Sequence, residues 1–242
     1  MGKVSIDVVI SHPYIEEEML LGKTVILIDT LRATSVIVTA LMNGAERVYP
    51  VKETAEALAL KETLKGEADV LLGGERKGLK IEGFDLANSP LEYTKAAVFG
   101  KTLIMSTTNG TRTMEKCFKA DEVIIGCLLN ASAAAKTALM TGRDILIVNS
   151  GTNGKFTMDD FITAGCMVSA MKQQNPESAL SDLAAAAQLV YQAHPDIVSA
   201  MADCYHYNYL QSIGLTGDLA YCLQRDLTDT VPVLKNGIIT AG

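Results

Sequence analysis

The sequence predicts an α/β protein whose mostly parallel sheet is covered by helices on both faces. Short runs rich in Val and Ile alternate with helix-like stretches up to about residue 150, which is typical of βαβ units. The strand-like runs are continuously apolar, as expected for strands that are buried on both faces. Gly44, Gly66 and Gly142 fall just past helix-like stretches, where a left-handed residue is favoured. These observations predict a three-layer α/β/α arrangement.

The expected strands are the apolar runs at 4–10, 24–29, 46–51, 68–73, 101–106, 121–126 and 144–149. Helices are expected between them at 34–44, 52–66, 90–98, 110–117 and 132–142. After Asn149 the pattern becomes mainly helical, with helices expected at 157–173, 177–193, about 195–213 and 217–226.

The length of 242 residues suits one large α/β domain or two small ones. Residues 1–150 are expected to form a mainly parallel α/β lobe. Within this lobe, the segment 74–89 is rich in Gly and charge and is interpreted as an irregular insertion, either a functional loop or part of a smaller second lobe. Residues 151–242 are expected to be mainly helical, and both their contribution to a second lobe and the boundary are left open.

The composition argues against several classes of partner. Lys and Arg number 21 against 28 Asp and Glu, which gives a net charge of −7, whereas a nucleic-acid binder usually carries a basic excess. Aromatic residues make up 5% and Trp is absent, so no base-stacking surface is expected. No apolar run approaches the roughly 18 residues of a membrane span. The five cysteines form no CxxC pair, which indicates reduced thiols in a cytoplasmic protein.

Polar clusters follow several of the expected strands. They are DTLRATS (29–35), GGERKG (73–78), STTNGTR (106–112) and NSGTNGKFTMDD (149–160). In an open parallel sheet ligands bind beyond the carboxyl ends of the strands, so these clusters are expected to share one edge. Turn and cap residues explain any single cluster equally well, but the set, with its Arg and carboxylate side chains, favours a binding site.

The third cluster is suited to binding an anion. Thr107, Thr108 and Asn109 offer short polar side chains directly after a strand. Gly110 and Thr111 offer backbone N–H groups at an expected helix start, where orphan donors and the helix dipole favour anions.

The first cluster has the same layout. Thr34 and Ser35 stand at an expected helix start, and Arg32 is available for bidentate contact with a phosphate or sulfonate. Thr34 or Ser35 is otherwise explained as an N-cap, a role that is compatible with ligand contact.

The carboxylates near these clusters are Asp29, Glu75, Asp85, Asp159 and Asp160. Mg²⁺ prefers one or two carboxylates together with ligand oxygens and waters, so these acids are candidate ligands. Each is otherwise explained by pairing with Arg or capping a helix, and the segment from Thr157 to Asp160 fits a capping box.

Other motifs are weak or absent. The histidines His12, His194 and His206 are interpreted as structural, with His206 in YHYNY expected to pack a helix pair. GGERKG is not GxGxxG, and GTNGKFT lacks the spacing of a Walker A loop. Neither a dinucleotide site nor a P-loop is therefore predicted.

Five segments taken together resemble the 2-phosphosulfolactate phosphatase family: IDTLRATSV (28–36), GGER (73–76), GFDLANSP (83–90), TTNGTR (107–112) and GTNGKFTMDDFITAG (151–165). The resemblance spans most of the chain. It implies a Mg²⁺-dependent acid phosphatase that converts 2-phospho-3-sulfolactate to 3-sulfolactate and phosphate, a step of coenzyme M biosynthesis. It also implies an α/β/α fold in two lobes and a homodimer. The family's late acidic position falls on Asp160 and not on Asp159.

The resemblance does not fix the role of each residue, and our working hypothesis places Mg²⁺ on Asp29 together with Glu75 or Asp160. Arg32 and the loop from Thr107 to Thr111 are expected to hold the phosphoryl group. The attacking group is left open between water at the metal and the side chain of Asp29 or Ser35.

Arg76, Asn88 and Ser89 are expected to orient the carboxylate or the sulfonate of the substrate. Two other functions stay open from the sequence. One is a phosphatase or isomerase for another small phosphorylated acid, and the other is a non-catalytic protein that binds an anionic metabolite.

Overall fold

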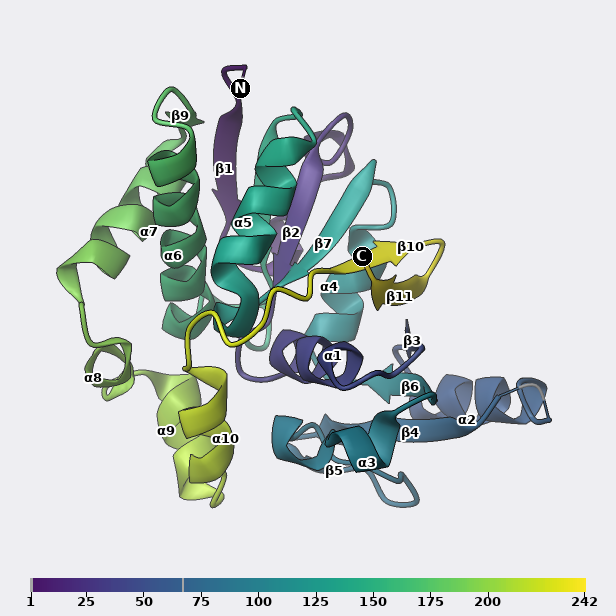
Figure 1. Ribbon diagram of the computed structural model, residues 1–242. Helices are drawn as coiled ribbons and strands as arrows, with labels where there is room; N and C mark the ends of the chain where they lie inside the picture. Colours follow the sequence, from purple (N-terminus) through teal and green to yellow (C-terminus); the bar gives the residue numbers. More distant parts are fainter. Residues whose placement is uncertain (1, 67) are drawn as a thin grey trace.

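An eleven-stranded sheet forms the centre of the computed structural model, which describes residues 2–66 and 68–242 (Figure 1). The strand order is β5-β4-β6-β3-β11-β10-β7-β2-β8-β1-β9. Helices lie on both faces of this mostly parallel sheet, which agrees with the α/β class and the layered arrangement predicted from the sequence.

One part of the sheet, here named the large strand group, is parallel throughout. Its strands are β1 (Ser5–Val9), β2 (Thr24–Ile28), β7 (Glu122–Gly126) and β8 (Ile145–Asn149), with the short β9 (Ala179–Leu180) at the edge. Ile28 lies between Gly126 and Asn149 in the register, so three of these strands end together.

The remaining parallel strands form the small strand group. It contains β3 (Arg47–Pro50), β4 (Val70–Arg76) and β6 (Thr102–Ser106), and the short β5 (Leu79–Lys80) pairs antiparallel with β4. All seven strands predicted from the sequence are present. The largest difference is in β4, which continues three residues further than predicted and so carries Glu75 and Arg76.

A C-terminal hairpin that the sequence analysis missed joins the two strand groups. β10 (Pro232–Lys235) pairs antiparallel with β7, and β11 (Ile238–Ala241) pairs antiparallel with β3. The two strand groups therefore run in opposite directions within the sheet. In Figure 1 the small group lies below the large one, at a marked angle to it, with the yellow hairpin at the side.

The inner helices pack on opposite faces of the large strand group. Ile26 and Ile28 of β2 belong to a core with α5 (Ala131–Met140) and α6 (Met158–Gln174). The alternate residues Val25 and Leu27 belong to a second core, which includes residues of α1 (Ala33–Met42) and Met114 of α4 (Gly110–Lys116). This alternation is the period-two pattern of a strand buried on both faces.

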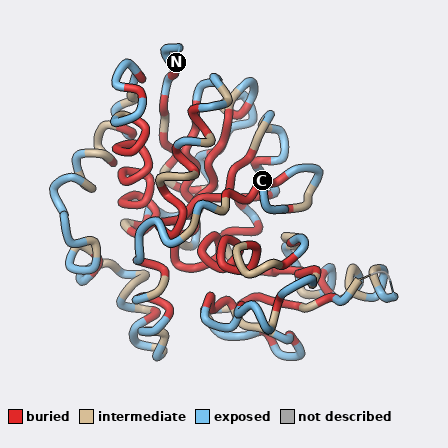
Figure 2. The backbone as a smooth tube through the Cα atoms, viewed as in Figure 1, coloured by how far each residue is buried: buried red, intermediate tan, exposed pale blue. Residues whose placement is uncertain are grey.

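Outer helices cover these layers and are more exposed (Figure 2). α7 (Asp182–Ala193) packs against α6, while α2 (Thr54–Thr63) packs against β4 and β6 of the small group. Among the helices of the described residues, none combines the length and the hydropathy that a membrane crossing requires.

Four predicted helices differ clearly from the structure. The stretch 90–98 is a 3₁₀ turn (Pro90–Glu92) followed by the short α3 (Lys95–Val98). The stretch 177–193 begins with β9, and its helix starts only at Asp182. The stretch 195–213 divides into α8 (Ile197–Met201) and α9 (Tyr205–Ser212). The predicted helix at 217–226 is α10 (Thr216–Cys222), which ends earlier.

A close contact between α6 and α7 generates a stability prediction. A Cβ added to Gly165 would lie 2.1 Å from the carbonyl oxygen of Ala187, so the two helices touch through their backbones. We expect Gly165→Ala to lower the free energy of unfolding by about 1–3 kcal/mol, because the helices must separate. Urea unfolding followed by circular dichroism measures the change.

Gly217→Ala in α10 is the matched control for this substitution. Gly217 is exposed, and its added Cβ would meet only the tip of the Leu91 side chain, at 3.2 Å. We expect no loss of stability in the control. Equal unfolding midpoints for wild type and Gly165→Ala would contradict the close helix contact.

Candidate active site

A cleft of about 490 Å³ lies where the two strand groups meet α9. The segment after β2 contributes Asp29, Leu31 and Arg32, and the end of β4 with the following turn contributes residues 75–78. The loop after β6 contributes residues 107–109, and α9 contributes Tyr205, His206, Tyr209 and Leu210. The carboxyl ends of both strand groups thus meet at one site, although the groups run in opposite directions.

Asp29 is held at the end of β2 by bonds within its own loop. Its Oδ1 accepts the backbone N–H of Ala33 at 3.2 Å, and its own N–H donates to Thr34 Oγ1 at 3.1 Å. Gly110 allows α4 to approach, because a Cβ there would lie 2.9 Å from Asp29 Oδ2. Burial raises the pKa of Asp29 to about 6; the charges of Asp159 and Glu75 add to the rise, and the charge of His206 opposes it.

Glu75 joins two loops of the cleft through its carboxylate. Oε1 accepts the backbone N–H of Thr108 at 2.7 Å, and Oε2 accepts the backbone N–H of Gly78 at 2.8 Å. The side chain thereby fixes the loop after β6 against the turn between β4 and β5. The neighbouring hydroxyl Oγ1 of Thr108 is buried and has no hydrogen-bond partner among the residues that the structure describes.

Arg32 forms a buried ion pair on the wall of the cleft. Nη1 donates to Asp218 Oδ2 at 2.5 Å, and Nη2 donates to the carbonyl oxygen of Gly78 at 2.8 Å. Ser89 Oγ donates to the other oxygen of Asp218 at 2.6 Å. The guanidinium therefore ties α10 and the β4–β5 turn to the loop that carries Asp29.

Arg76 is also engaged by the protein itself. Its guanidinium donates to the carbonyl oxygens of Lys52, Glu75 and Ser106, and to Ser106 Oγ at 2.8 Å. These bonds hold together the carboxyl ends of the strands in the small group. They leave little of the guanidinium for an anion.

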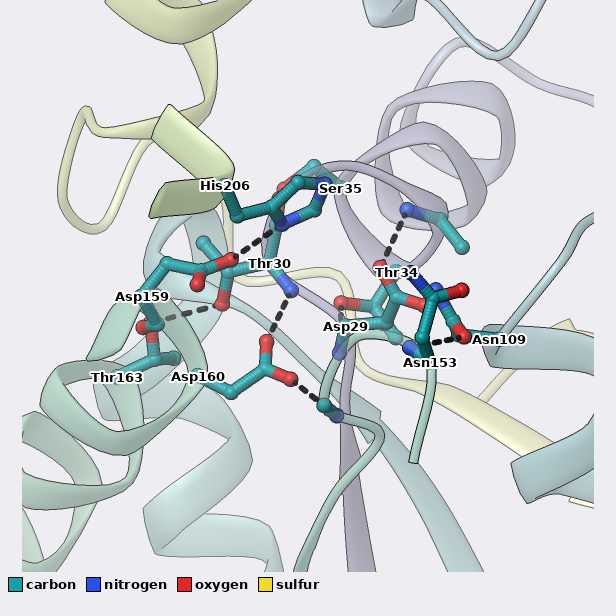
Figure 3. Close-up of polar contacts among 12 residues, drawn as sticks. Asp29, Thr30, Thr34, Ser35, Asn109, Asn153, Asp159, Asp160, Thr163 and His206 are labelled. Carbon is teal, nitrogen blue, oxygen red and sulfur yellow. Dashed lines mark hydrogen bonds and ion pairs between the residues drawn. The ribbon is translucent and has the colours of Figure 1, made fainter. Parts of the chain in front are cut away.

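Asp160 stands behind Asp29 and organises the neighbouring backbone (Figure 3). Its oxygens accept the N–H groups of Thr30 at 2.9 Å and Gly151 at 2.9 Å. Burial raises its pKa well above the ordinary value, and the charges of Asp159 and Asp29 add to the rise.

Asp159 and His206 form a pair at the same end of the cleft (Figure 3), with Asp159 Oδ2 and His206 Nδ1 3.4 Å apart. Burial alone lowers the pKa of His206, but the hydrogen bond and charge of Asp159, together with the charge of Asp29, outweigh it and raise the pKa above its ordinary value. A second cavity of about 460 Å³ adjoins the cleft and shares His206 with it.

The structure brings together many of the residues that the sequence analysis selected. The predicted residues that line the cleft are Asp29, Arg32, Glu75, Arg76, Asn88, Thr107, Thr108 and Asn109. Those that do not line it are Thr34, Ser35, Ser89, Gly110, Thr111 and Asp160. Several of the second set have structural contacts instead: Ser35 Oγ is fully buried and donates to the carbonyl oxygen of Thr30, and Thr111 bonds Thr107.

The predicted metal ligands are only partly grouped. Within the described ranges, no group of three or more His, Cys, Asp and Glu side chains is arranged to hold a metal ion. Asp29 and Glu75 both line the cleft, and the charge of Glu75 contributes to the raised pKa of Asp29, whereas Asp160 lies outside the cleft. Two carboxylates beside open space for waters and a phosphate suit Mg²⁺, which seldom takes an all-protein site.

Sequence reasoning missed two features of this site. Asp218 lies in a late helix, far from any strand end, so no pattern linked it to Arg32. His206 was interpreted as a packing residue, although it lines the cleft. The sequence did contain a signal for His206. It lies in a helix in which Tyr205 and Tyr209 are four residues apart and therefore share one face, next to the histidine.

Comparisons with known proteins place the chain in a family. Residues 11–237 match the family described as 2-phosphosulpholactate phosphatase. A Clostridium perfringens (strain SM101) protein called "Probable 2-phosphosulfolactate phosphatase" is 50% identical over 238 residues, which cover 98% of this chain and 96% of that protein. A Clostridium acetobutylicum protein of the same name is 45% identical over 98% of this chain and 100% of its own length. The chain therefore belongs to the 2-phosphosulpholactate phosphatase family, a family of phosphoric monoester hydrolases.

Proposed function

We propose that this chain hydrolyses 2-phospho-3-sulfolactate to 3-sulfolactate and phosphate. Family membership and the names of the relatives support this substrate. The observation that carries the proposal is the cleft around Asp29, where carboxylates, a buried free hydroxyl and basic side chains meet from both strand groups. A small substrate with several negative charges fits a cleft of about 490 Å³.

The loop after β6 is the part of the cleft that receives the phosphoryl group. Thr108 Oγ1 is free to donate a hydrogen bond, and Asp29 Oδ2 lies close to this loop across Gly110. Glu75 fixes the loop through the Thr108 N–H, so the donor is positioned before the substrate arrives. Phosphoryl transfer depends mainly on such positioning and on electrostatics.

The carboxylates of the cleft support a cation site, because the lining side chains Arg32 and Arg76 are bonded to other groups of the protein. Asp29 and Glu75 are the carboxylates that would hold Mg²⁺, because both line the cleft. The bound ion would neutralise phosphate oxygens and lower the pKa of a bound water. Asp160 supports the site from behind through Thr30 and Gly151.

His206 is positioned to move a proton. Its Nδ1 faces Asp159, so Nε2 is the nitrogen that remains for the cleft. A raised pKa keeps more of the ring protonated near neutral pH, as a donor to the leaving alkoxide requires. Water is our preferred attacking group over Ser35, whose hydroxyl is fully buried and donates to a backbone carbonyl.

The wider setting of the reaction follows from the resemblance noted in the sequence. We place the reaction in coenzyme M biosynthesis and the protein in the cytoplasm as a homodimer. The five cysteines are free thiols, which is compatible with a reducing compartment. Exposed apolar side chains such as Leu189 and Met140 supply surface for contact between subunits.

The first test of the function is phosphate release from 2-phospho-3-sulfolactate. We expect release that depends on added Mg²⁺ and stops with EDTA. Asp29→Asn should reduce kcat by about 10²-fold or more, as the loss of other groups that stabilise charge in a transition state does. Asp85→Asn is the control, since Asp85 bonds Lys61 and the Leu72 N–H outside the cleft. Release that is unaffected by EDTA would remove the metal from the proposal.

Asp29→Asn should also stabilise the metal-free protein. The pKa of Asp29 is raised from 3.8 to about 6 on folding, so the folded protein loses stability as the pH rises between these values. The loss is complete above about pH 7 and amounts to at most about 3 kcal/mol. Asparagine lacks this loss, so the variant should gain stability at pH 7.5 and much less at pH 4.5.

Urea unfolding in EDTA at both pH values measures the gain. Asp85→Asn should show no gain, because contacts with the Leu72 N–H and Lys61 outweigh burial and lower the pKa of Asp85. If the metal-free Asp29→Asn protein is less stable than wild type at pH 7.5, the prediction is wrong. Neighbouring groups then stabilise the charged Asp29 carboxylate by more than burial destabilises it.

A further inference from the structure

We propose that Lys77 is the residue that selects the sulfonate of the substrate. This inference rests on the proposed function and deepens it. Lys77 lies at the turn between β4 and β5, is exposed, and lines the cleft. The other cations of the cleft are already engaged, and the backbone of Lys77 is fixed from several sides.

The other basic side chains that line the cleft have partners in the protein. Arg32 bonds Asp218 and the Gly78 carbonyl, and Arg76 donates to three carbonyls and a hydroxyl. His206 pairs with Asp159. In the part of the chain that the structure describes, Lys77 is the basic residue of the cleft whose side chain makes no hydrogen bond or ion pair. Lys77 is therefore the basic side chain of the cleft that is available to bind an anionic group of the substrate.

The turn that carries Lys77 is held by contacts from three segments. The carbonyl oxygen of Lys77 accepts the hydroxyl of Tyr209 at 2.9 Å, and that of Gly78 accepts Arg32 Nη2 at 2.8 Å. The N–H of Gly78 donates to Glu75 at 2.8 Å. The base of the side chain is thus fixed, while its ammonium stays free to meet a ligand.

The backbone at Lys77 is unusual for a lysine. Its φ is +53° and that of Gly78 is +74°, the left-handed pair of a two-residue hairpin turn. Asn or Gly is strongly favoured at the first of these positions, and a long side chain there is uncommon. Asparagine would satisfy the turn equally well, so the turn alone does not explain the lysine.

The charge of an ammonium suits a sulfonate. Lysine presents three donors from a compact point charge. A sulfonate has three equivalent oxygens and stays anionic at every physiological pH. Lys77 stands at an exposed position of the cleft, where it can meet a non-reacting group of the substrate.

The test compares two substrates that differ only in the sulfonate, 2-phospho-3-sulfolactate and 2-phospholactate. Lys77→Met keeps the length of the side chain and removes its charge. We expect kcat/KM for the sulfonated substrate to fall about 10- to 50-fold, mainly through KM, because a remote contact contributes to binding and not to the chemical step. For 2-phospholactate we expect a change of less than about threefold. Lys77→Arg should retain most of the preference.

Lys155→Met is the matched control, since this exposed lysine lines the neighbouring cavity and not the cleft. It should leave the substrate ratio unchanged. An equal loss of kcat/KM for both substrates in Lys77→Met would assign the residue a structural role and overturn the proposal. So would an unchanged ratio.

A binding measurement separates this proposal from the proposed function. If wild type releases no phosphate from the sulfonated ester, the proposed function fails. Isothermal titration calorimetry with 3-sulfolactate and lactate then tests Lys77 on its own. Tighter binding of 3-sulfolactate by wild type, lost in Lys77→Met, supports the assignment. A wild type without that preference, or a variant that keeps it, overturns the assignment.

Discussion

Several carboxylates lie close together in and around the cleft, and the other groups of the site are arranged to compensate their negative charge. Glu75 and Asp160 each accept two backbone N–H groups, and Asp159 faces His206. Among the described residues Asp29 accepts one N–H, from Ala33, and burial raises its pKa to about 6. Burial also raises the pKa of Asp160 well above its ordinary value, so neither charge is fully compensated by the protein. Of the two, Asp29 lines the cleft, where a cation and a phosphate can compensate it, because a buried charge without a partner is unfavourable.

The arginines of the cleft bind groups of the protein, although their chemistry is suited to binding the phosphate of a substrate. Arg32 and Arg76 are the side chains best suited to a phosphate, yet both are bonded to groups of the protein. Removing either partner of a buried ion pair such as Arg32–Asp218 leaves an uncompensated charge, so such a pair fixes the relative position of its segments. Here it fixes α10 and the β4–β5 turn against the loop after β2. The arginines thus build the wall of the cleft, and smaller free groups such as Thr108 Oγ1 remain for the ligand.

The sequence predicted the parts of the site that follow strand ends, and little else. Asp29, Glu75 and the loop from Thr107 were found because each breaks a continuous apolar run. The polar clusters after the strands predict one parallel edge, whereas the hairpin after Val231 reverses the direction of the small strand group. Its signal was present, since Asn236 and Gly237 lie between two strand-like segments and adopt the left-handed turn that this pair favours. Asp218 and His206 come from late helices, whose approach to the cleft depends on tertiary contacts that no local pattern encodes.

The opposed strand groups explain why so many local contacts are needed. In a single parallel sheet, neighbouring strand ends are aligned by the backbone ladder itself, as Ile28, Gly126 and Asn149 are here. Across the hairpin no ladder aligns the end of β2 with the ends of β4 and β6. Side chains supply that alignment instead, with Arg32 reaching Gly78 and Glu75 linking Gly78 to Thr108. Gly78 therefore joins both sides of the cleft. The contacts of Gly78 also fix the backbone next to Lys77, and so they determine where the free ammonium of Lys77 lies.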